Sequence, residues 1–180
     1  ILVGTQMVAK GHDFPGITLV GVICADQSLN FPDFRSGERT FQLLAQVAGR
    51  AGRGDRPGRV ILQTFNPQHF SILAAQNQDF ESFFKREIDF RKALAYPPFT
   101  RMVGLRISGP SLGQTADAAR HMGATCQSLI AADPVYRSCI QILGPIEAPI
   151  PRIANRYRWQ ILLKSPDSIS LHRFTRACTS

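Results

Sequence analysis

Residues 17–25 read ITLVGVICA, and this stretch decides how the first part of the 180-residue chain is interpreted. The segment is apolar almost without interruption, which is typical of a strand covered on both faces of a parallel sheet. Residues 38–48 follow with apolar side chains at helical spacing, among them Phe41 and Leu44. Residues 59–65 (RVILQTF) then predict a second strand. This strand–helix–strand order predicts an α/β layer with parallel strands.

The chain begins with residues 1–5 (ILVGT) and has no starting methionine. Their apolar character predicts a buried strand that is already under way at the first residue. We therefore expect the chain to be a piece cut from a longer protein.

The remainder of the chain predicts a change of architecture. Residues 68–95 have a helical pattern that breaks near Asn77, and Pro97-Pro98 stops any helix. Beyond the prolines we expect a small α+β unit in which a strand begins at residues 140–143 and the proline-rich residues 144–151 follow it. The other expected strands are residues 102–108 and 157–163, and the expected helices are residues 112–132 and 168–177.

Composition indicates an anionic partner. The net charge is +8, and a basic surplus of this size favours polyanions. Residues 1–95 carry 11 Lys+Arg against 9 Asp+Glu, or +2, and residues 96–180 carry 10 against 4, or +6. The surplus is therefore mostly C-terminal, although an unspecialised basic surface has the same composition.

Cysteine and histidine usage predicts neither a disulfide framework nor a metal site. The four cysteines and four histidines are scattered and form no ligand-like pair. There is no signal peptide, and no apolar run reaches the 18 residues or so that a membrane span needs. We expect no membrane contact, a monomer, and a cytoplasmic location.

The sequence QVAGRAGR over residues 46–53 carries the first chemical signal. On a helix, Gln46, Arg50 and Arg53 would share one face. Gly49 and Gly52 would each cost roughly 1 kcal/mol relative to alanine, so their presence indicates a backbone that something approaches closely. The planar guanidinium groups of Arg50 and Arg53, next to an accessible glycine backbone, are suited to bind a phosphate group with two hydrogen bonds each. A solvated helix end with two incidental arginines is the alternative.

The same stretch resembles motif VI of superfamily 2 helicases. A second segment, residues 4–15 (GTQMVAKGHDFP), is similar to motif V because Thr5, Gly11 and Asp13 have its spacing. A hydroxyl and backbone N–H groups can hold a nucleic-acid phosphate. The resemblance assigns DNA binding to four residues: Gly4, Thr5, Gln6 and Lys10. It assigns nucleotide binding to another four: Gln46, Gly49, Gly11 and Asp13.

Two usual parts of a nucleotide site are missing from this sequence. It contains neither a G-x-x-x-x-G-K-[ST] phosphate loop nor an acidic magnesium-binding box. Arg53 and Arg50 are therefore interpreted as the catalytic residues, arginine fingers offered to ATP and Mg²⁺ bound mostly by another lobe. Such a finger stabilises charge on the transferring phosphoryl group. We expect the 180 residues alone to be inactive.

Further segments narrow the resemblance to one family. FPDFR at residues 31–35, ERTFQLL at 38–44, LAYPPF at 94–99, LGP at 143–145 and RYRWQ at 156–160 resemble the primosomal protein N′ (PriA) family. That family is one of bacterial replication-restart helicases. The resemblance implies a fold of α/β class: a partial RecA-like helicase lobe 2, a parallel sheet with helices, followed by a small α+β C-terminal domain.

The resemblance also implies the function of the complete protein. It would be an ATP-dependent 3′→5′ DNA helicase that recognises stalled or repaired forks and initiates primosome assembly, and it would associate with the nucleoid. Its partners would be forks and single-stranded DNA, primosome proteins, the replicative helicase loader, and the acidic tail of single-stranded DNA-binding protein. Arg156 and Gln160 match the family's tail-binding residues, and i and i+4 lie on one face of a strand. An exposed edge strand with alternating polar residues is the alternative.

By this interpretation residues 1–78 belong to lobe 2, residues 79–98 form a helical connector, and residues 99–180 form the DNA- and partner-binding domain. The family's zinc module lies upstream, and no ligand set for it is present here. The family adds a strand after the last helix, so we expect the C-terminal sheet to be one strand short. Another superfamily 2 helicase, acting on RNA or remodelling forks, and a non-catalytic basic nucleic-acid-binding module remain alternatives.

Overall fold

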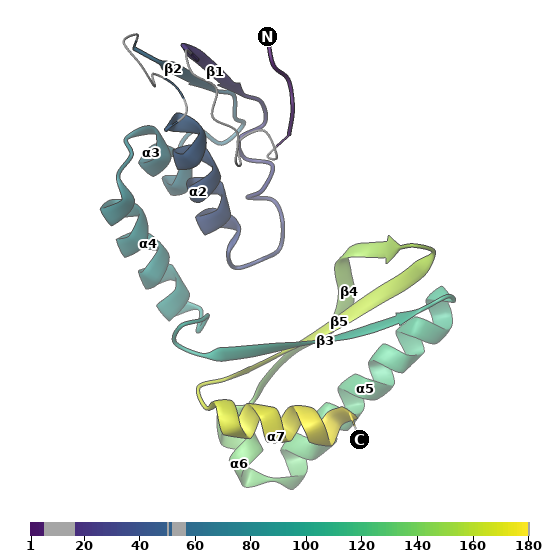
Figure 1. The fold of residues 1–180 in the computed structure, drawn as a ribbon. Helices are drawn as coiled ribbons and strands as arrows, with labels where there is room; N and C mark the ends of the chain where they lie inside the picture. Colours follow the sequence, from purple (N-terminus) through teal and green to yellow (C-terminus); the bar gives the residue numbers. More distant parts are fainter. Residues whose placement is uncertain (6–16, 50, 52–56, 180) are drawn as a thin grey trace. The chain divides into compact units, whose positions relative to one another are not determined.

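The computed structural model describes residues 1–5, 17–49, 51 and 57–179 (Figure 1). The chain forms two compact units, Ile1–Phe90 and Arg91–Ser180. The division falls inside the predicted connector, residues 79–98. Both units mix helices with strands, and the sheet is parallel in the first and antiparallel in the second.

The sheet of the first unit is the predicted parallel pair. Strands β1 (Leu19–Val22) and β2 (Arg59–Leu62) pair in parallel, and α2 (Ser36–Ala48) lies between them in sequence. Beyond the strand ends, the Ala25 N–H donates to the Gln63 carbonyl at 2.9 Å. The α/β layer expected from the strand–helix–strand order is therefore confirmed in its pairing.

Two sequence-based expectations for this sheet are wrong. β1 is not covered on both faces, because Leu19 is 59% exposed and Ile61, on the same face of β2, is 52% exposed. The described sheet has two strands. Val20, Val22, Val60 and Leu62 are half-buried on its inner face, where Val22 and Leu62 pack against the core. Residues 1–5 are exposed and not in a strand, since no described strand pairs with them.

Aromatic side chains from three helices form the core of the first unit. The predicted helical pattern is confirmed as two pieces, α3 (Phe70–Gln76) and α4 (Phe80–Ala93). Phe41 of α2 stacks on Phe83 of α4 with ring centroids 4.3 Å apart. Phe70 of α3 stacks on the same ring at 5.7 Å. These contacts pack all three helices around Phe83.

A histidine caps the first turn of α3. The Nδ1 of His69 accepts a hydrogen bond from the Ser71 N–H at 3.2 Å. Partial burial, and then the nearby Arg86 guanidinium, lower the pKa of His69 below 6.5. Folding therefore favours the neutral imidazole, the form in which this nitrogen can accept.

We expect this cap to make stability pH-dependent. Because folding lowers the pKa of His69, the neutral imidazole contributes its full stabilisation above the unfolded-state pKa of 6.5. That contribution is lost as the pH falls through the lower folded-state pKa. His69→Asn keeps an acceptor that does not titrate. Between about pH 7.5 and pH 5 the melting temperature of wild type should therefore fall more than that of His69→Asn. His172→Asn, at an exposed position of α7, is the control, and equal slopes for His69→Asn and wild type would contradict the assignment.

The second unit is a three-stranded antiparallel sheet with helices on one face (Figure 1). The strand order β3-β5-β4 places β5 in the centre. The strands are β3 (Arg101–Gly109), β4 (Gln141–Ile153) and β5 (Arg156–Ser165), and the helices are α5 (Leu112–Ala132), α6 (Pro134–Cys139) and α7 (Ser168–Thr179). The helices expected over residues 112–132 and 168–177 are confirmed; α6 was not predicted.

β4 corrects the expectation that the strand gives way to a proline-rich segment. It continues through Pro145, Pro149 and Pro151 to Ile153. Proline is tolerated there because β4 is an edge strand of the described sheet. A proline has no N–H group, and on the outer side of an edge strand no neighbouring strand needs one. Gly144, with φ of 101°, lies where the register first shifts.

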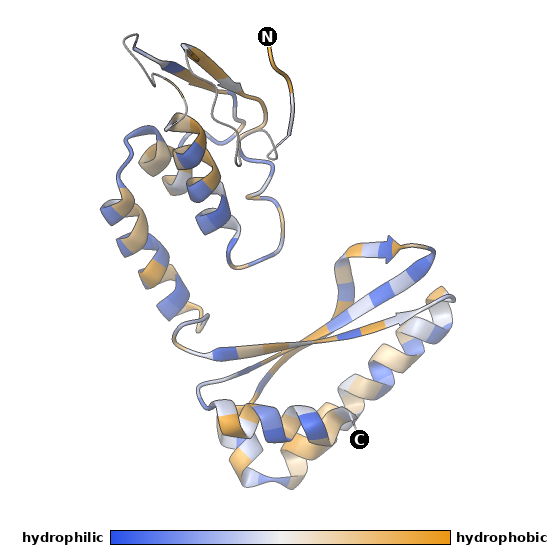
Figure 2. Cartoon of the chain, in the orientation of Figure 1, coloured by the Kyte–Doolittle hydropathy of each residue, from blue (hydrophilic) through white to orange (hydrophobic). Residues whose placement is uncertain are grey.

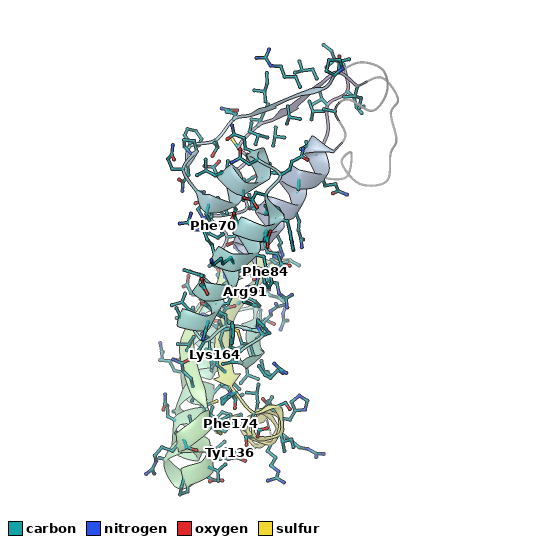
Figure 3. All side chains as sticks on the ribbon, turned by 90° about the vertical axis from the view of Figure 1, so that its left-hand side faces the viewer. Phe70, Phe84, Arg91, Tyr136, Lys164 and Phe174 are labelled. Atoms are coloured by element: carbon teal, nitrogen blue, oxygen red, sulfur yellow. The ribbon has the colours of Figure 1, made fainter. Side chains whose placement is uncertain are left out.

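The core of the second unit lies between the sheet and its helices. Phe174 of α7 is fully buried, and its ring meets that of Tyr136 edge-on at 5.1 Å (Figure 3). Cys126 of α5 and Cys178 of α7 are free thiols whose sulfur atoms lie 3.2 Å apart. Burial, together with Cys126, raises the pKa of Cys178 to about 12. The thiols therefore act as small apolar groups here.

Within the described ranges, the helices are all too short or too polar to cross a membrane.

Candidate functional site

The C-terminal end of α2 positions the first predicted site residues. Gln46 is exposed in the last turn, and Gly49 is the C-cap, with its N–H donating to the Ala45 carbonyl at 3.1 Å. Among the described residues, a Cβ added to Gly49 would meet the carbonyls of Ala45 and Gln46, at ordinary contact distances of 3.6 and 3.7 Å. The helix therefore ends in a residue that has no side chain of its own.

The helix ends where the sequence predicted. The helical spacing of residues 38–48 places the end at Ala48, and α2 ends there. The shared face of Gln46, Arg50 and Arg53 stays a prediction, because it includes residues outside the described ranges. Glycine is a poor helix former, and Gly49 follows directly after the last helical residue. Arg50 and Arg53 lie outside the described residues.

The predicted motif V residues are only partly described. Gly4 and Thr5 are exposed and have no regular secondary structure. Gln6, Lys10, Gly11 and Asp13 lie outside the described residues. The structure therefore does not bring this set together with Gln46 and Gly49, and the assignments stay predictions.

A buried carboxylate at the end of β1 was missed by the sequence reasoning. Asp26 is buried, and its Oδ2 accepts from the Phe65 N–H at 3.0 Å, which joins the segments that follow β1 and β2. An acidic residue directly after an apolar strand is the signal that could have found it. Its contact is structural, because it supports the carboxyl end of the sheet, where loops of parallel α/β units carry function.

The second predicted site lies on β5, on the sheet face turned away from the helices. Ile161 and Leu163 point into the helix-covered core, so the alternate residues lie on the opposite, open face. Arg156 and Gln160 are both on this face. Gln160 is directly opposite Arg106 of β3 and Ile146 of β4. Arg158 also lies on this open face, and Lys164 has the same orientation on β5 but is buried.

The polar groups of this face are held by neighbouring backbone. Arg156 Nη2 donates to the Ser108 carbonyl at 2.8 Å. At the other end of β5, Lys164 is 5% exposed; its Nζ donates to the Leu94 carbonyl at 3.1 Å and lies 3.9 Å from the centroid of the Tyr96 ring (Figure 3). Burial lowers the pKa of Lys164. Lys164 therefore anchors residues 94–96 to the sheet.

Sequence reasoning found Arg156 and Gln160 but missed Arg106, Arg158 and Lys164. The signal was present in β5, where polar side chains recur at every second position from Arg156 to Gln160. Figure 2 shows hydrophilic residues recurring along β5 toward its turn with β4. The contribution of β3 depends on strand register, which local sequence does not specify.

The two structural units differ more in net charge than residues 1–95 and residues 96–180 do. Residues 1–90 carry 9 Lys+Arg against 9 Asp+Glu, or zero. Residues 91–180 carry 12 against 4, or +8. All of the net charge of the chain therefore belongs to the second unit, which also carries the open face.

Metal-ligating side chains do not gather in the described ranges: no group of three or more His, Cys, Asp or Glu residues is placed to hold an ion. The described residues therefore do not supply a ligand set for zinc.

Comparison with known proteins relates both units of the chain to the same proteins. The family model for the primosomal protein N C-terminal domain matches residues 92–180. The replication restart protein PriA of Bacillus subtilis is 45% identical over 91% of this chain and 20% of its own length. PriA of Synechocystis is 44% identical over 100% of the chain and 21% of its own length, and that of Haemophilus influenzae is 39% identical over 98% and 23%.

The chain belongs to the PriA family. The family resemblance noted in the sequence is thereby confirmed. The relationship extends over the first unit as well as the PriA C-terminal domain, because the matches cover 91–100% of the chain. The chain spans about a fifth to a quarter of the length of these PriA relatives.

Proposed function

We propose that this chain is the nucleotide-sensing and partner-binding part of an ATP-dependent 3′→5′ DNA helicase that acts in replication restart. The observation that carries the proposal is the parallel β1–α2–β2 unit, whose helix delivers Gln46 and Gly49 immediately before Arg50 and Arg53. The PriA relatives named replication restart proteins support the biological setting.

The first unit would belong to lobe 2 of a RecA-like motor. A parallel sheet with a crossover helix supports this assignment, and functional residues of such sheets cluster in loops at the carboxyl ends of the strands. The Asp26–Phe65 hydrogen bond would stabilise that end of the sheet. Residues 1–78 remain our proposed extent of the lobe.

The arginines would complete an ATP site whose phosphate loop lies on another lobe. Arg53 would be the principal finger on the transferring phosphoryl group, and Arg50 would contact the γ-phosphate or an acidic partner. Both roles use the fixed positive charge and planar fork of arginine. Bound Mg²⁺ would share the neutralisation of the phosphates, held mostly by the other lobe.

Gln46, Gly49, Gly11 and Asp13 would line the nucleotide from this side. Gly49 has no side chain of its own, which supports a close approach of a ligand to the backbone. Gly4, Thr5, Gln6 and Lys10 would follow the DNA backbone. Gln46 would couple the state of the nucleotide to this DNA-binding segment.

DNA-stimulated ATP hydrolysis by the complete protein tests the proposal. We expect hydrolysis that rises with single-stranded DNA, unwinding with 3′→5′ polarity, and no hydrolysis by the 180-residue chain alone. Clear turnover by the pure 180-residue chain would rule out the two-lobe site. DNA binding by the complete protein with no hydrolysis would instead favour a basic binding module.

The open face of the second unit would bind the acidic tail of single-stranded DNA-binding protein. Arg156 keeps further guanidinium donors besides the one used on Ser108, because arginine has five. A carboxylate would take those donors, and Gln160 would bind the peptide backbone. The primosome proteins and the helicase loader are further proposed partners.

Arg156→Ala should weaken binding of an acidic tail peptide by about tenfold, the effect of losing one charge-assisted contact. The measurement is a fluorescence titration of labelled peptide into the 180-residue chain. Arg173→Ala, an exposed arginine on α7, is the matched control and should keep wild-type affinity. Unchanged affinity in Arg156→Ala would refute this peptide site.

A further inference from the structure

The tip of the β4–β5 hairpin has an unusual combination of exposed apolar and cationic groups. β4 and β5 are joined by Ala154 and Asn155, both with positive φ, in a two-residue turn that pairs Ile153 with Arg156. Figure 1 shows this turn on the opposite side of the sheet from α5 and α7. We call residues 148–158 the ribbon tip.

The ribbon tip is shaped by a bulge. Glu147 pairs with Trp159 and Arg152 pairs with Tyr157, so residues 148–151 of β4 face a single residue of β5. These four residues are Ala-Pro-Ile-Pro. Bulges bend a strand and redirect its side chains. Here Ile150 is 47% exposed, and Ile153 beside the turn is 46% exposed.

The ribbon tip is strongly cationic, and its arginine side chains contact uncharged groups. It contains three arginines and no acidic residue. Arg152 stacks on the Tyr157 ring at 5.0 Å and donates to the Asn155 side chain at 3.2 Å. Arg156 donates to the Ser108 carbonyl, and Arg158 lies 3.5 Å from the Ile150 carbonyl. The contacts orient the guanidinium groups without cancelling their charge.

The arginines lie on both faces of the ribbon. Arg152 is paired with Tyr157 and shares its face, whereas Arg156 and Arg158 are on the open face of β5. A protruding cationic ribbon suits a groove walled by phosphates on both sides. The major groove of B-form DNA is about 12 Å wide and admits a two-stranded ribbon, whose strands are about 4.8 Å apart. Exposed apolar side chains such as isoleucine can contact the thymine methyl groups that the major groove displays.

We propose that the ribbon tip docks in a groove of duplex DNA. Arg152 and Arg158 contact the phosphates of opposite walls, and Ile150 and Ile153 pack against base edges or sugars between them. This rests on the proposed function only in taking DNA as the partner. It adds a duplex contact that is separate from the Arg50–Arg53 nucleotide site and from the peptide contact of Arg156 with Gln160.

The test is equilibrium binding of the 180-residue chain to a labelled blunt duplex, followed by anisotropy at several salt concentrations. Arg152→Gln/Arg158→Gln should weaken binding about tenfold or more and lower the salt slope by about 2, one for each lost phosphate contact. Ile150→Ser/Ile153→Ser should weaken binding roughly fivefold with the salt slope unchanged, because these side chains carry no charge.

Matched controls separate the tip from general charge and folding. Arg137→Gln/Arg173→Gln removes two exposed arginines from α6 and α7, and Ile169→Ser removes an exposed isoleucine from α7. Each should keep duplex affinity within about twofold, apart from the small uniform effect of net charge. All variants should keep the wild-type circular dichroism spectrum, because the substituted side chains lie outside the buried core.

Three results would overturn the proposal. The first is that the wild-type chain does not bind duplex at low salt. The second is that the tip variants lose no more duplex affinity than the control variants. The third is that the tip variants lose affinity for the acidic peptide but keep their affinity for duplex DNA. None of these results bears on ATP hydrolysis by the complete protein, so failure of the tip and failure of the helicase proposal are distinguishable.

Discussion

Arg53→Ala in the complete protein should reduce DNA-stimulated ATP hydrolysis by about a thousandfold or more while DNA binding stays close to wild type. The proposed finger stabilises charge that develops on the transferring phosphoryl group. Alanine removes a stabilising interaction that is made mainly in the transition state, so hydrolysis falls much further than nucleotide or DNA affinity. The measurement is a steady-state ATPase assay over a range of single-stranded DNA, with fork binding followed on the same preparations.

Two further variants make the Arg53 result specific. Arg53→Lys keeps a positive charge but loses the planar fork, and should restore only part of the rate. Arg59→Ala removes an exposed arginine at the start of β2 and should hydrolyse ATP at the wild-type rate. Near-normal hydrolysis by Arg53→Ala, or equal losses in Arg53→Ala and Arg59→Ala, would remove Arg53 from the catalytic assignment.

Phe174→Ala should destabilise the second unit by about 3–5 kcal/mol, the usual cost of removing a buried phenylalanine. Phe174 is fully buried between α7, the sheet and α6, and its ring contacts Tyr136 edge-on. Alanine would lose that contact and leave a cavity that the surrounding backbone cannot close. Because small domains have only about 5–15 kcal/mol of stability, a large share of the folded population would be lost.

Trp159 gives a direct measurement of this effect. It is the only tryptophan in the sequence and lies on β5, so its fluorescence in a urea titration reports on the second unit alone. Phe174→Leu, which preserves most of the volume, should cost less than about half as much. Phe99→Ala, at an exposed position, should cost about 1 kcal/mol or less. A loss below about 1 kcal/mol in Phe174→Ala would contradict the packing described here.

Local pattern was sufficient for most elements. α5 covers residues 112–132 as predicted, because a long apolar stripe at helical spacing needs no information from elsewhere in the chain. The break between α3 and α4 near Asn77 and the parallel pairing of β1 with β2 were also predictable. The end of α2 at Ala48 was predictable as well, because Gly49, a poor helix former, follows it.

Features that depend on pairing partners were not predictable in the same way. The prolines of residues 144–151 indicated a strand end, and only the edge position of β4 explains why the strand continues through them. Cys126 and Cys178 are far apart in sequence, and only the packing of α5 against α7 brings their thiols together. The anchoring of residues 94–96 by Lys164 likewise needed the folded sheet.

By itself, the sequence determined the type and order of most helices and strands, the family, and the residues proposed for the nucleotide and peptide sites. These depend on local periodicity and on motif spacing, both of which are written along the chain. The tertiary structure decided which face of β5 is open, how Arg106 joins it, and how a proline-containing bulge exposes Ile150 among arginines. Strand register and edge position cause these features, because they arise from contacts between segments that no single stretch of sequence contains.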